Sequence, residues 1–262
     1  KSWSGYQDEL AWASLWLFQI TENREYLTKA NLHESLMTTK TEIQEHSWDD
    51  KRIAVKYKLK ESLGVFGSDV SSYEKEVHDF CQYNDPLSTQ KRAVFTPDGS
   101  LYISEWAPLR LALNNYFICL LFDFERYARL AYKQMQYILG DNSKKYSYVI
   151  GYGTKFPMNV LHKGASCPLT GVCDWGYKDT IKNQNNPQIL YGALVSGPDE
   201  FDNFDDSRDN WKQNSVSINY QTGLVGLSLA LQEYQANLND SEVGRAPDFD
   251  KAKIFNPDYE NV

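Results

Sequence analysis

Residues 192–215 carry the sequence GALVSGPDEFDNFDDSRDNWKQNS, which contains two glycines, a proline and six acidic residues and ends at Ser215. It overlaps the end of a longer segment, 140–213, in which Gly, Asn, Asp and Pro recur throughout. These residue types favour turns and irregular backbone over regular helices. Irregular segments of this length inside a compact domain usually serve a function. We therefore expect a site in this part of the chain.

Helical patterns flank the irregular segment on both sides. The predicted helices are 10–20, 24–37, 70–81, 108–122, 124–139 and 215–234. Gly140 suits the left-handed position that follows a helix. Residues 51–63 are ambiguous, because their apolar residues alternate as in a strand while the lysine-rich intervals also permit a helix.

Antiparallel helical hairpins in an all-α chain are the architecture that these patterns predict. No Gly/Ser-rich linker or low-complexity tract divides the 262 residues. Residues 1–262 are therefore expected to form one domain or part of one.

The composition excludes several classes of protein. The net charge is −8 and the pI about 5.1, which argues against binding to nucleic acid or to an anionic membrane surface. No run of about 18 apolar residues is present, so no transmembrane helix is expected. The 7 Trp, 18 Tyr and 12 Phe suit a packed core, and some of them suit a cleft that stacks on sugars.

The four cysteines carry two separate expectations. Cys119 lies in an apolar helical run and is expected to be a buried free thiol. Cys167 and Cys173 flank a short loop, a spacing that permits a disulfide and suits an oxidising compartment. A zinc site is not expected, because there is no CxxC and the histidines are scattered.

Further motifs follow one another along the chain. They are WSGYQDELAWA at 3–13, SWDDK at 47–51, WAPLR at 106–110, YILGDN at 137–142 and HKGAS at 162–166. Together with 192–215 they resemble the second half of the catalytic domain of glycoside hydrolase family 9, the cellulase family with inverting endoglucanases. The resemblance implies half of an (α/α)6 barrel of the six-hairpin glycosidase type. The family's first half, with its DAGD motif, is expected outside this chain, on a missing N-terminal half or a partner chain.

The resemblance also predicts a general acid and finds a different residue. The family signature, roughly GGPD…D…DxRxxYxxNE, ends in a glutamate where this chain has Ser215. A serine hydroxyl is far too weak an acid to protonate a leaving group. Leu161, Lys163, Trp211 and Asn219 also depart from the family pattern. Takeover of the acid role by Asp206 or Asp209 is less favoured than a loop-bracing role.

The family implies positions for sugar and metal contacts. Substrate contacts are expected at Trp3, Trp106, Arg110, His162, Lys163 and Tyr220. A structural Ca²⁺ is expected at Ser4, Gly5, Asp8, Glu9 and Asp49. Two acids at a helix start also have a simpler interpretation, because they complement the helix dipole.

Three interpretations of function remain open. The first is a family 9-like pseudoenzyme that binds β-glucan or serves a structural role. The second is the C-terminal chain of an endo-β-1,4-glucanase whose other half is a separate segment. The third is a scaffold subunit of a larger assembly without sugar binding. A secreted location is expected, and the sequon Asn239-Asp240-Ser241 agrees with it.

Overall fold

A computed structural model describes residues 3, 5–38, 41–90, 92–170, 173 and 184–240. Helices dominate: α1 (Gln7–Thr21), α2 (Arg24–Ser35), α3 (Arg52–Gly64), α4 (Ser71–Tyr83), α5 (Pro108–Phe122), α6 (Phe124–Ile138), α7 (Lys163–Ser166), α9 (Trp211–Asn214), the 3₁₀ turn η1 (Ile218–Tyr220) and α10 (Gln221–Asp240). The strands β1 (Val94–Phe95) and β2 (Leu101–Tyr102) pair as a short antiparallel hairpin. The expected helical architecture is confirmed, and the hairpin adds a detail that the sequence did not indicate.

The chain divides into two compact units. The first consists of residues 1–93 and 114–127, and the second of residues 94–113 and 128–262. Helices α1 to α4 belong to the first unit, and the loop-rich segment with α7, α9 and α10 belongs to the second. The division falls within α5 and near the start of α6, so these two helices contribute residues to both units.

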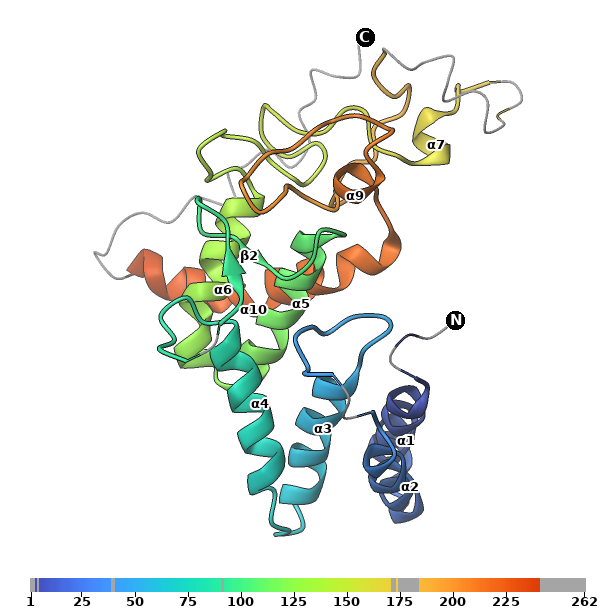
Figure 1. Cartoon of the computed structure of the whole chain (residues 1–262), viewed down its shortest axis with the longest axis vertical. Coiled ribbons are helices and arrows are strands. Elements are labelled where there is room, and N and C mark those ends of the chain that lie inside the picture. The colour runs from blue at the N-terminus through green and yellow to red at the C-terminus, as the bar shows by residue number, and fades with distance from the viewer. Residues whose placement is uncertain are drawn as a thin grey trace. The chain divides into compact units, whose positions relative to one another are not determined.

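In the first unit, α1 and α2 form a tight helical hairpin (Figure 1). Asp8 and Glu9 lie in the first turn of α1, where negative charge complements the helix dipole. Glu22 ends α1 in the left-handed conformation, with φ 56°. The next residue, Asn23, caps α2 by accepting a hydrogen bond from the amide of Glu25 at 3.0 Å. This local chemistry turns the chain back on itself within two residues.

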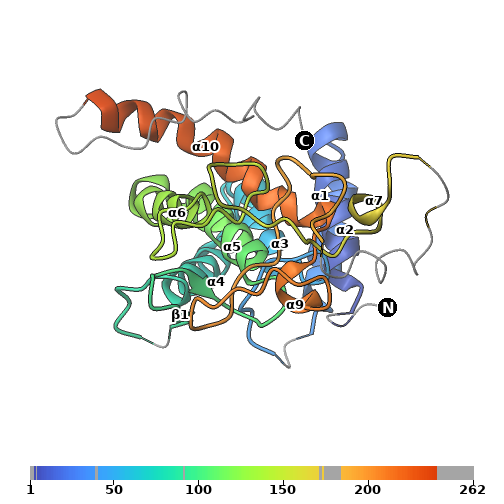
Figure 2. The same cartoon turned by 90° about the horizontal axis from the view of Figure 1, so that it is seen from above.

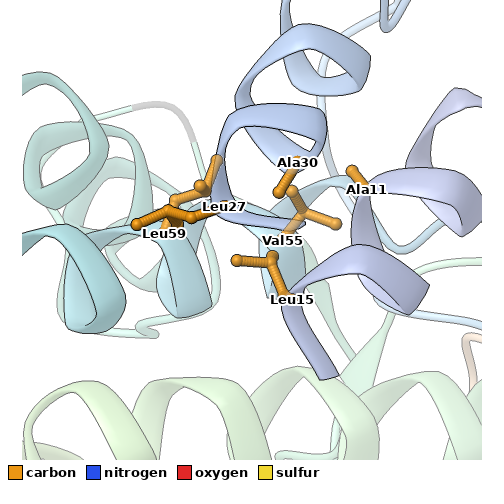
Figure 3. Packing of buried hydrophobic residues seen from close by; sticks show 6 residues of the cluster. All are labelled: Ala11, Leu15, Leu27, Ala30, Val55 and Leu59. Atoms are coloured by element: carbon orange, nitrogen blue, oxygen red, sulfur yellow. The ribbon is translucent and has the colours of Figure 1, made fainter. Parts of the chain in front are cut away.

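The ambiguous segment 51–63 is a helix, α3, because its apolar side chains have a helical partner surface. Val55 and Leu59, one turn apart, are fully buried and pack into a cluster of buried side chains (Figure 3). The other members of the cluster come from α1 and α2 and are Ala11, Leu15, Leu27 and Ala30. The amide of Arg52 donates to Oδ1 of Asp50 at 3.1 Å and so satisfies one free N–H at the start of the helix.

The cysteine predictions divide. Cys167 and Cys173 form a disulfide, as their spacing permitted. The prediction of a free thiol at Cys119 is wrong, because Cys119 is bonded to Cys81. Both residues are fully buried, one on α4 and one on α5, and their Cα atoms lie 5.4 Å apart. The apolar run correctly indicated burial, but the helix packing that brings the two sulfurs together has no local signal.

In the second unit, α10 passes across α6 (Figures 1 and 2), and the rings of Tyr132 and Tyr234, one from each helix, lie 5.7 Å apart. The final helix was expected to begin at Ser215, and this is wrong. Ser215 and Val216 are extended and pair with Leu161 and Val195, so their backbone groups are used outside any helix. The α-helix begins only at Gln221, after the 3₁₀ turn.

The loops of the second unit pack closely against α5 at one glycine. Gly197 has φ +113°, which L side chains rarely adopt. A Cβ atom built there would lie 2.4 Å from Cγ of Leu109. The amide of Leu109 donates to the carbonyl of Ser196 at 3.1 Å, so the loop and the helix are also bonded at this point. Only glycine allows this approach.

Replacement of Gly197 by alanine should cost about 2–5 kcal/mol of unfolding free energy, from backbone strain and overpacking together. Gly192 provides a matched control, because it has φ +81° but no atom within 4 Å of the place that a Cβ atom would take. Gly192→Ala should therefore cost only the conformational share, about 1–2 kcal/mol. Urea denaturation of both variants measures the difference. Equal losses would show that contact with Leu109 does not matter.

Candidate functional site

Backbone pairing brings three distant loop segments of the second unit together. The amide of Leu161 donates to the carbonyl of Asn214 at 2.8 Å, and Leu161 forms a parallel bridge with Ser215. The amide of Ser196 donates to the carbonyl of Ser215 at 2.9 Å. Two positions that depart from the expected pattern, Leu161 and Ser215, are therefore direct neighbours across a backbone pairing.

Ser215 lies in a cluster of three hydroxyl groups. Its Oγ is 2.8 Å from Oγ of Ser196 and 3.3 Å from the hydroxyl of Tyr220. The Ser196 and Tyr220 oxygens are themselves 3.5 Å apart, and Ser196 is fully buried. Neutral hydroxyls can share hydrogen bonds with a sugar, but they do not carry the acidic proton that glycoside cleavage requires.

Aromatic and cationic side chains adjoin this hydroxyl cluster. The indole Nε1 of Trp106 donates to the Tyr220 hydroxyl at 3.2 Å. The guanidinium carbon of Arg110 lies 5.5 Å from the centre of the Tyr220 ring. Trp106 and Trp211 meet edge to face, with centroids 5.1 Å apart and an interplanar angle of 86°. Three predicted contact residues, Trp106, Arg110 and Tyr220, are thus brought together with Ser215.

Asp206 braces the loop, as expected, and its carboxylate is fully engaged. It accepts hydrogen bonds from the amides of Met158 and Asn159, at 2.8 and 3.1 Å. The side-chain amides of Asn159 and Asn214 also donate to it. Burial raises the pKa of Asp206 above its ordinary value, while these donors act in the opposite direction. A carboxylate held by four donors is a structural anchor rather than a mobile acid.

Arg208 anchors the same loop from the other side. Its Nε donates to Oδ1 of Asn186 at 2.7 Å, and its Nη2 donates to Oδ1 of Asn159 at 3.2 Å. The side chain is buried. The planar guanidinium therefore connects segments around 159 and 186 to the signature loop. Its role is structural.

His162 and Lys163 follow Leu161 directly, and both are exposed. Nδ1 of His162 accepts a hydrogen bond from the amide of Ala165 at 3.1 Å, so His162 caps α7. This bond assigns the proton of a neutral imidazole to Nε2. The sequence predicted a sugar contact here and did not indicate the capping role, for which a Ser or Asn would be the usual signal.

Trp3 and the residues expected to bind Ca²⁺ lie in the first unit, apart in the chain from the hydroxyl cluster. Trp3 is 73% exposed, and its amide donates to both carboxylate oxygens of Asp49, at 3.0 and 3.1 Å. Oδ2 of Asp8 accepts from the amide of Lys51 at 2.8 Å. The prediction for Ser4 falls outside the residues that the structure describes.

Glu9 is the residue at this helix start that best fits a cation. Its Oε2 is buried and makes no hydrogen bond, and Oε1 lies 3.5 Å from Nζ of Lys51. Burial, and next the carboxyl of Asp8, raise the pKa of Glu9. Across the described parts of the chain, no three His, Cys, Asp or Glu side chains form a metal cluster. The donors fit a hard cation in kind, because oxygen ligands suit Ca²⁺.

Comparisons with known proteins agree with the motif order. The sequence profile of Glycosyl hydrolase family 9 matches residues 1–228. Endoglucanase 1 of Persea americana is 30% identical over 261 residues, covering 90% of this chain and 52% of that protein. Endoglucanase 5 of Arabidopsis thaliana is 32% identical over 259 residues, covering 86% and 41%.

Solved structures show the same fold. The endoglucanase of the termite Nasutitermes takasagoensis superimposes with a TM-score of 0.75 at 31% identity, covering 87% of this chain and 51% of that chain. Endoglucanase CelQ of Clostridium thermocellum, complexed with cellobiose and cellotriose, gives a TM-score of 0.78 at 29% identity, covering 95% and 41%. The chain spans about half, or less, of the length of these relatives. With the profile match, the motifs and the shared helical fold, the chain belongs to glycosyl hydrolase family 9 and corresponds to about half of its (α/α)6 barrel.

Proposed function

We propose that this chain binds β-1,4-linked glucan and does not hydrolyse it. The observation that carries the proposal is the hydroxyl cluster of Ser215, Ser196 and Tyr220, at the position where the family signature ends in its acid. The ligand class follows from family membership and from CelQ, whose structures hold cello-oligosaccharides. Half-exposed Trp106 beside this cluster supplies a surface suited to a pyranose ring.

Loss of hydrolysis follows from the need for two carboxyl groups. An inverting glycosidase protonates the leaving oxygen with one and activates water with the other. In the second unit, the side-chain partners of Ser215 are hydroxyls, and the nearby Asp206 is held by four donors. General acid catalysis contributes roughly 10²–10⁴-fold, so loss of the acid should lower the rate of hydrolysis by about that factor.

The alternative function is that of one half of an active endoglucanase. The chain covers 51% of the termite enzyme and 52% of Endoglucanase 1 of Persea americana, which favours a second segment that completes the barrel. Such a segment would supply the base but not the acid at position 215. A scaffold role without sugar binding is the third candidate, and the absence of binding would favour it.

A surface on α1 fits the partner that completes the domain. Leu10, Ala13, Trp16, Leu17 and Ile20 are all exposed, Ile20 to 77%. Their spacing places them on one side of the helix, opposite the buried side that enters the core cluster. A helix that is apolar on two sides is normally packed between two layers. We therefore assign this outward stripe to a helical segment from the other half of a family 9 domain.

A structural Ca²⁺ at the start of α1 belongs to the same proposal. Asp8, Glu9 and Asp49 would hold it, with the carbonyl of Gly5 as a further oxygen ligand. The buried Oε2 of Glu9, which makes no hydrogen bond, would then gain a partner. The ion would tie the beginning of α1 to the 47–51 segment and supply no chemistry of its own.

Secretion is proposed on the disulfides. Cys81–Cys119 and Cys167–Cys173 are both formed, and such bonds persist mainly in oxidising compartments. In the described residues, none of the helices is both long and apolar enough to cross a membrane.

Calorimetric titration with cellotetraose should give a saturable heat, weakened by Trp106→Ala because the ring surface is lost. Reducing-sugar release from soluble β-glucan should stay at background, both for the native chain and for Ser215→Glu, which restores only one of two carboxyl groups. No heat at millimolar ligand would eliminate sugar binding. Sugar release by the native chain would eliminate the proposed loss of hydrolysis.

The α1 stripe predicts a separation between stability and association. Leu17→Glu with Ile20→Glu should change the unfolding free energy by no more than about 0.5 kcal/mol per site, because both side chains are exposed. The core control Leu15→Ala should cost about 2–5 kcal/mol. The native chain should be co-expressed with the part of Persea americana Endoglucanase 1 that lies outside the region matched by this chain. We expect that part to co-purify with the native chain. Equal retention by the double Glu variant, or none by the native chain, contradicts the assignment.

Calcium should stabilise the chain against heat. At a hundredfold excess over Kd, the ion would add about 2.7 kcal/mol to the unfolding free energy, so Tm should rise with CaCl₂ and fall with EDTA. Glu9→Gln should remove the response to calcium, whereas exposed Glu61→Gln should leave it intact. Identical Tm values of the native chain in CaCl₂ and in EDTA would rule the site out.

A further inference from the structure

Trp211 lies beside Trp106 in the second unit but is not among the residues expected to contact sugar. It opens the short helix α9, four positions before Ser215, and it is 46% exposed. It meets a second half-exposed indole, Trp106, and contiguous exposed apolar side chains are the kind of surface that marks interaction sites. The family signature has tyrosine at this position, so the larger ring is a feature of this chain.

The backbone under Trp211 is held firmly on both sides. The side chain of Asn210 caps α9 by accepting from the amide of Gln213 at 3.3 Å. Gln213 in turn accepts from the amide of Asp205 at 2.9 Å. At the other end, Nδ2 of Asn214 donates to the carbonyl of Asn159 and to Asp206, both at 2.9 Å. The indole therefore projects from a positioned segment.

An ion pair joins the two tryptophan-bearing segments. Nζ of Lys212 lies 2.7 Å from Oε2 of Glu105, so the residue after Trp211 is bonded to the residue before Trp106. We call Glu105, Trp106, Trp211 and Lys212 the tryptophan corner. Its ion pair is partly exposed, at 40% and 67% of the two side chains, and places charged hydrogen-bonding groups beside the rings.

The ring geometry leaves surface for a ligand. In an edge-to-face pair at 86°, each indole keeps at least one face that its partner does not cover. Trp106 is itself 54% exposed and is fixed by its bond to Tyr220, which links the corner to the hydroxyl cluster. A β-linked glucosyl unit has the matching chemistry, with C–H groups on its ring faces and hydroxyls around its rim.

We propose that Trp211 is a glucan-contacting residue and that the tryptophan corner binds one glucosyl unit independently of any chemistry at Ser215. The inference rests on the proposed function, since it takes β-glucan as the ligand. The rings contact the sugar faces, and the Lys212–Glu105 pair hydrogen-bonds to the rim hydroxyls. The corner thus explains how affinity can persist in a site that has no acid.

The test compares cellotetraose binding by calorimetry in the native chain, Trp211→Ala, Trp211→Tyr and the control Phe66→Ala. Phe66 is an aromatic residue exposed to a similar extent, 45%, and it follows α3 in the first unit. We expect Trp211→Ala to raise Kd about tenfold, Trp211→Tyr to raise it about two- to threefold, and Phe66→Ala to leave it unchanged. The indole N–H resonance of Trp211, assigned from its loss in Trp211→Tyr, should shift as the sugar is added.

The outcomes separate this inference from the proposed function. Binding by the native chain that Trp106→Ala weakens and Trp211→Ala leaves unchanged, with a stationary Trp211 resonance, overturns the role of Trp211 alone. No binding by the native chain overturns both proposals. If Trp211→Ala does not fold, Trp211→Tyr and the resonance shift still decide, because tyrosine is the residue that the family signature has there.

Discussion

The hydrogen bond from the amide of Ser196 to the carbonyl of Ser215 is the constraint on which the candidate site depends. It holds the signature loop against the segment that enters α10, and the pairing of Leu161 with Ser215 adds a third segment. Gly197, next to Ser196, lets this assembly approach α5 to within the reach of Leu109. Because these contacts involve backbone atoms, the backbone position of residue 215 does not depend on its side chain.

This separation of frame and side chain is compatible with the proposed loss of the acid. A carboxyl group at 215 would lie among the hydroxyls of Ser196 and Tyr220, whereas a serine joins them as a third neutral partner. A serine at position 215 introduces no buried charge, so it carries no desolvation cost of that kind in the unfolding free energy. The loop anchors Asp206 and Arg208 bond to Met158 and Asn186, contacts that do not involve the side chain of residue 215.

Binding and hydrolysis depend on different atoms in this site. Hydrolysis requires carboxyl groups on both sides of the glycosidic bond. Affinity for sugar requires ring faces and hydrogen-bonding groups, which Trp106, Trp211 and Tyr220 present without a carboxyl group. A chain that loses the first can retain the second, and the tryptophan corner is where that retention would be measured.

Local patterns in the sequence determined most of the helices. Within a helix, proline is tolerated only in the first turn, so Pro108 indicates where α5 begins. The apolar run that follows Pro108 extends to Phe122, and α5 matches its prediction at both ends. The ordered motifs likewise indicated the family, and the serine at the end of the signature is the basis of the proposed loss of the acid. Segment 51–63 shows the limit of such patterns, because its sequence suits two structures and only the cluster around Val55 and Leu59 selects the helix.

Contacts between residues far apart in the chain were decided by the tertiary structure alone. In three pairs, neither segment has a local sequence pattern that identifies the other as its partner. These pairs are the Cys81–Cys119 bond, the pairing of Leu161 with Ser215 and the contact of Trp106 with Trp211. For the same reason the last helix begins later than predicted, at Gln221. The carbonyl of Ser215 accepts a hydrogen bond from the amide of Ser196, so it is not used in a helix. Sequence periodicity reports which face of an element is buried, whereas the identity of the residue across from it depends on how whole elements pack.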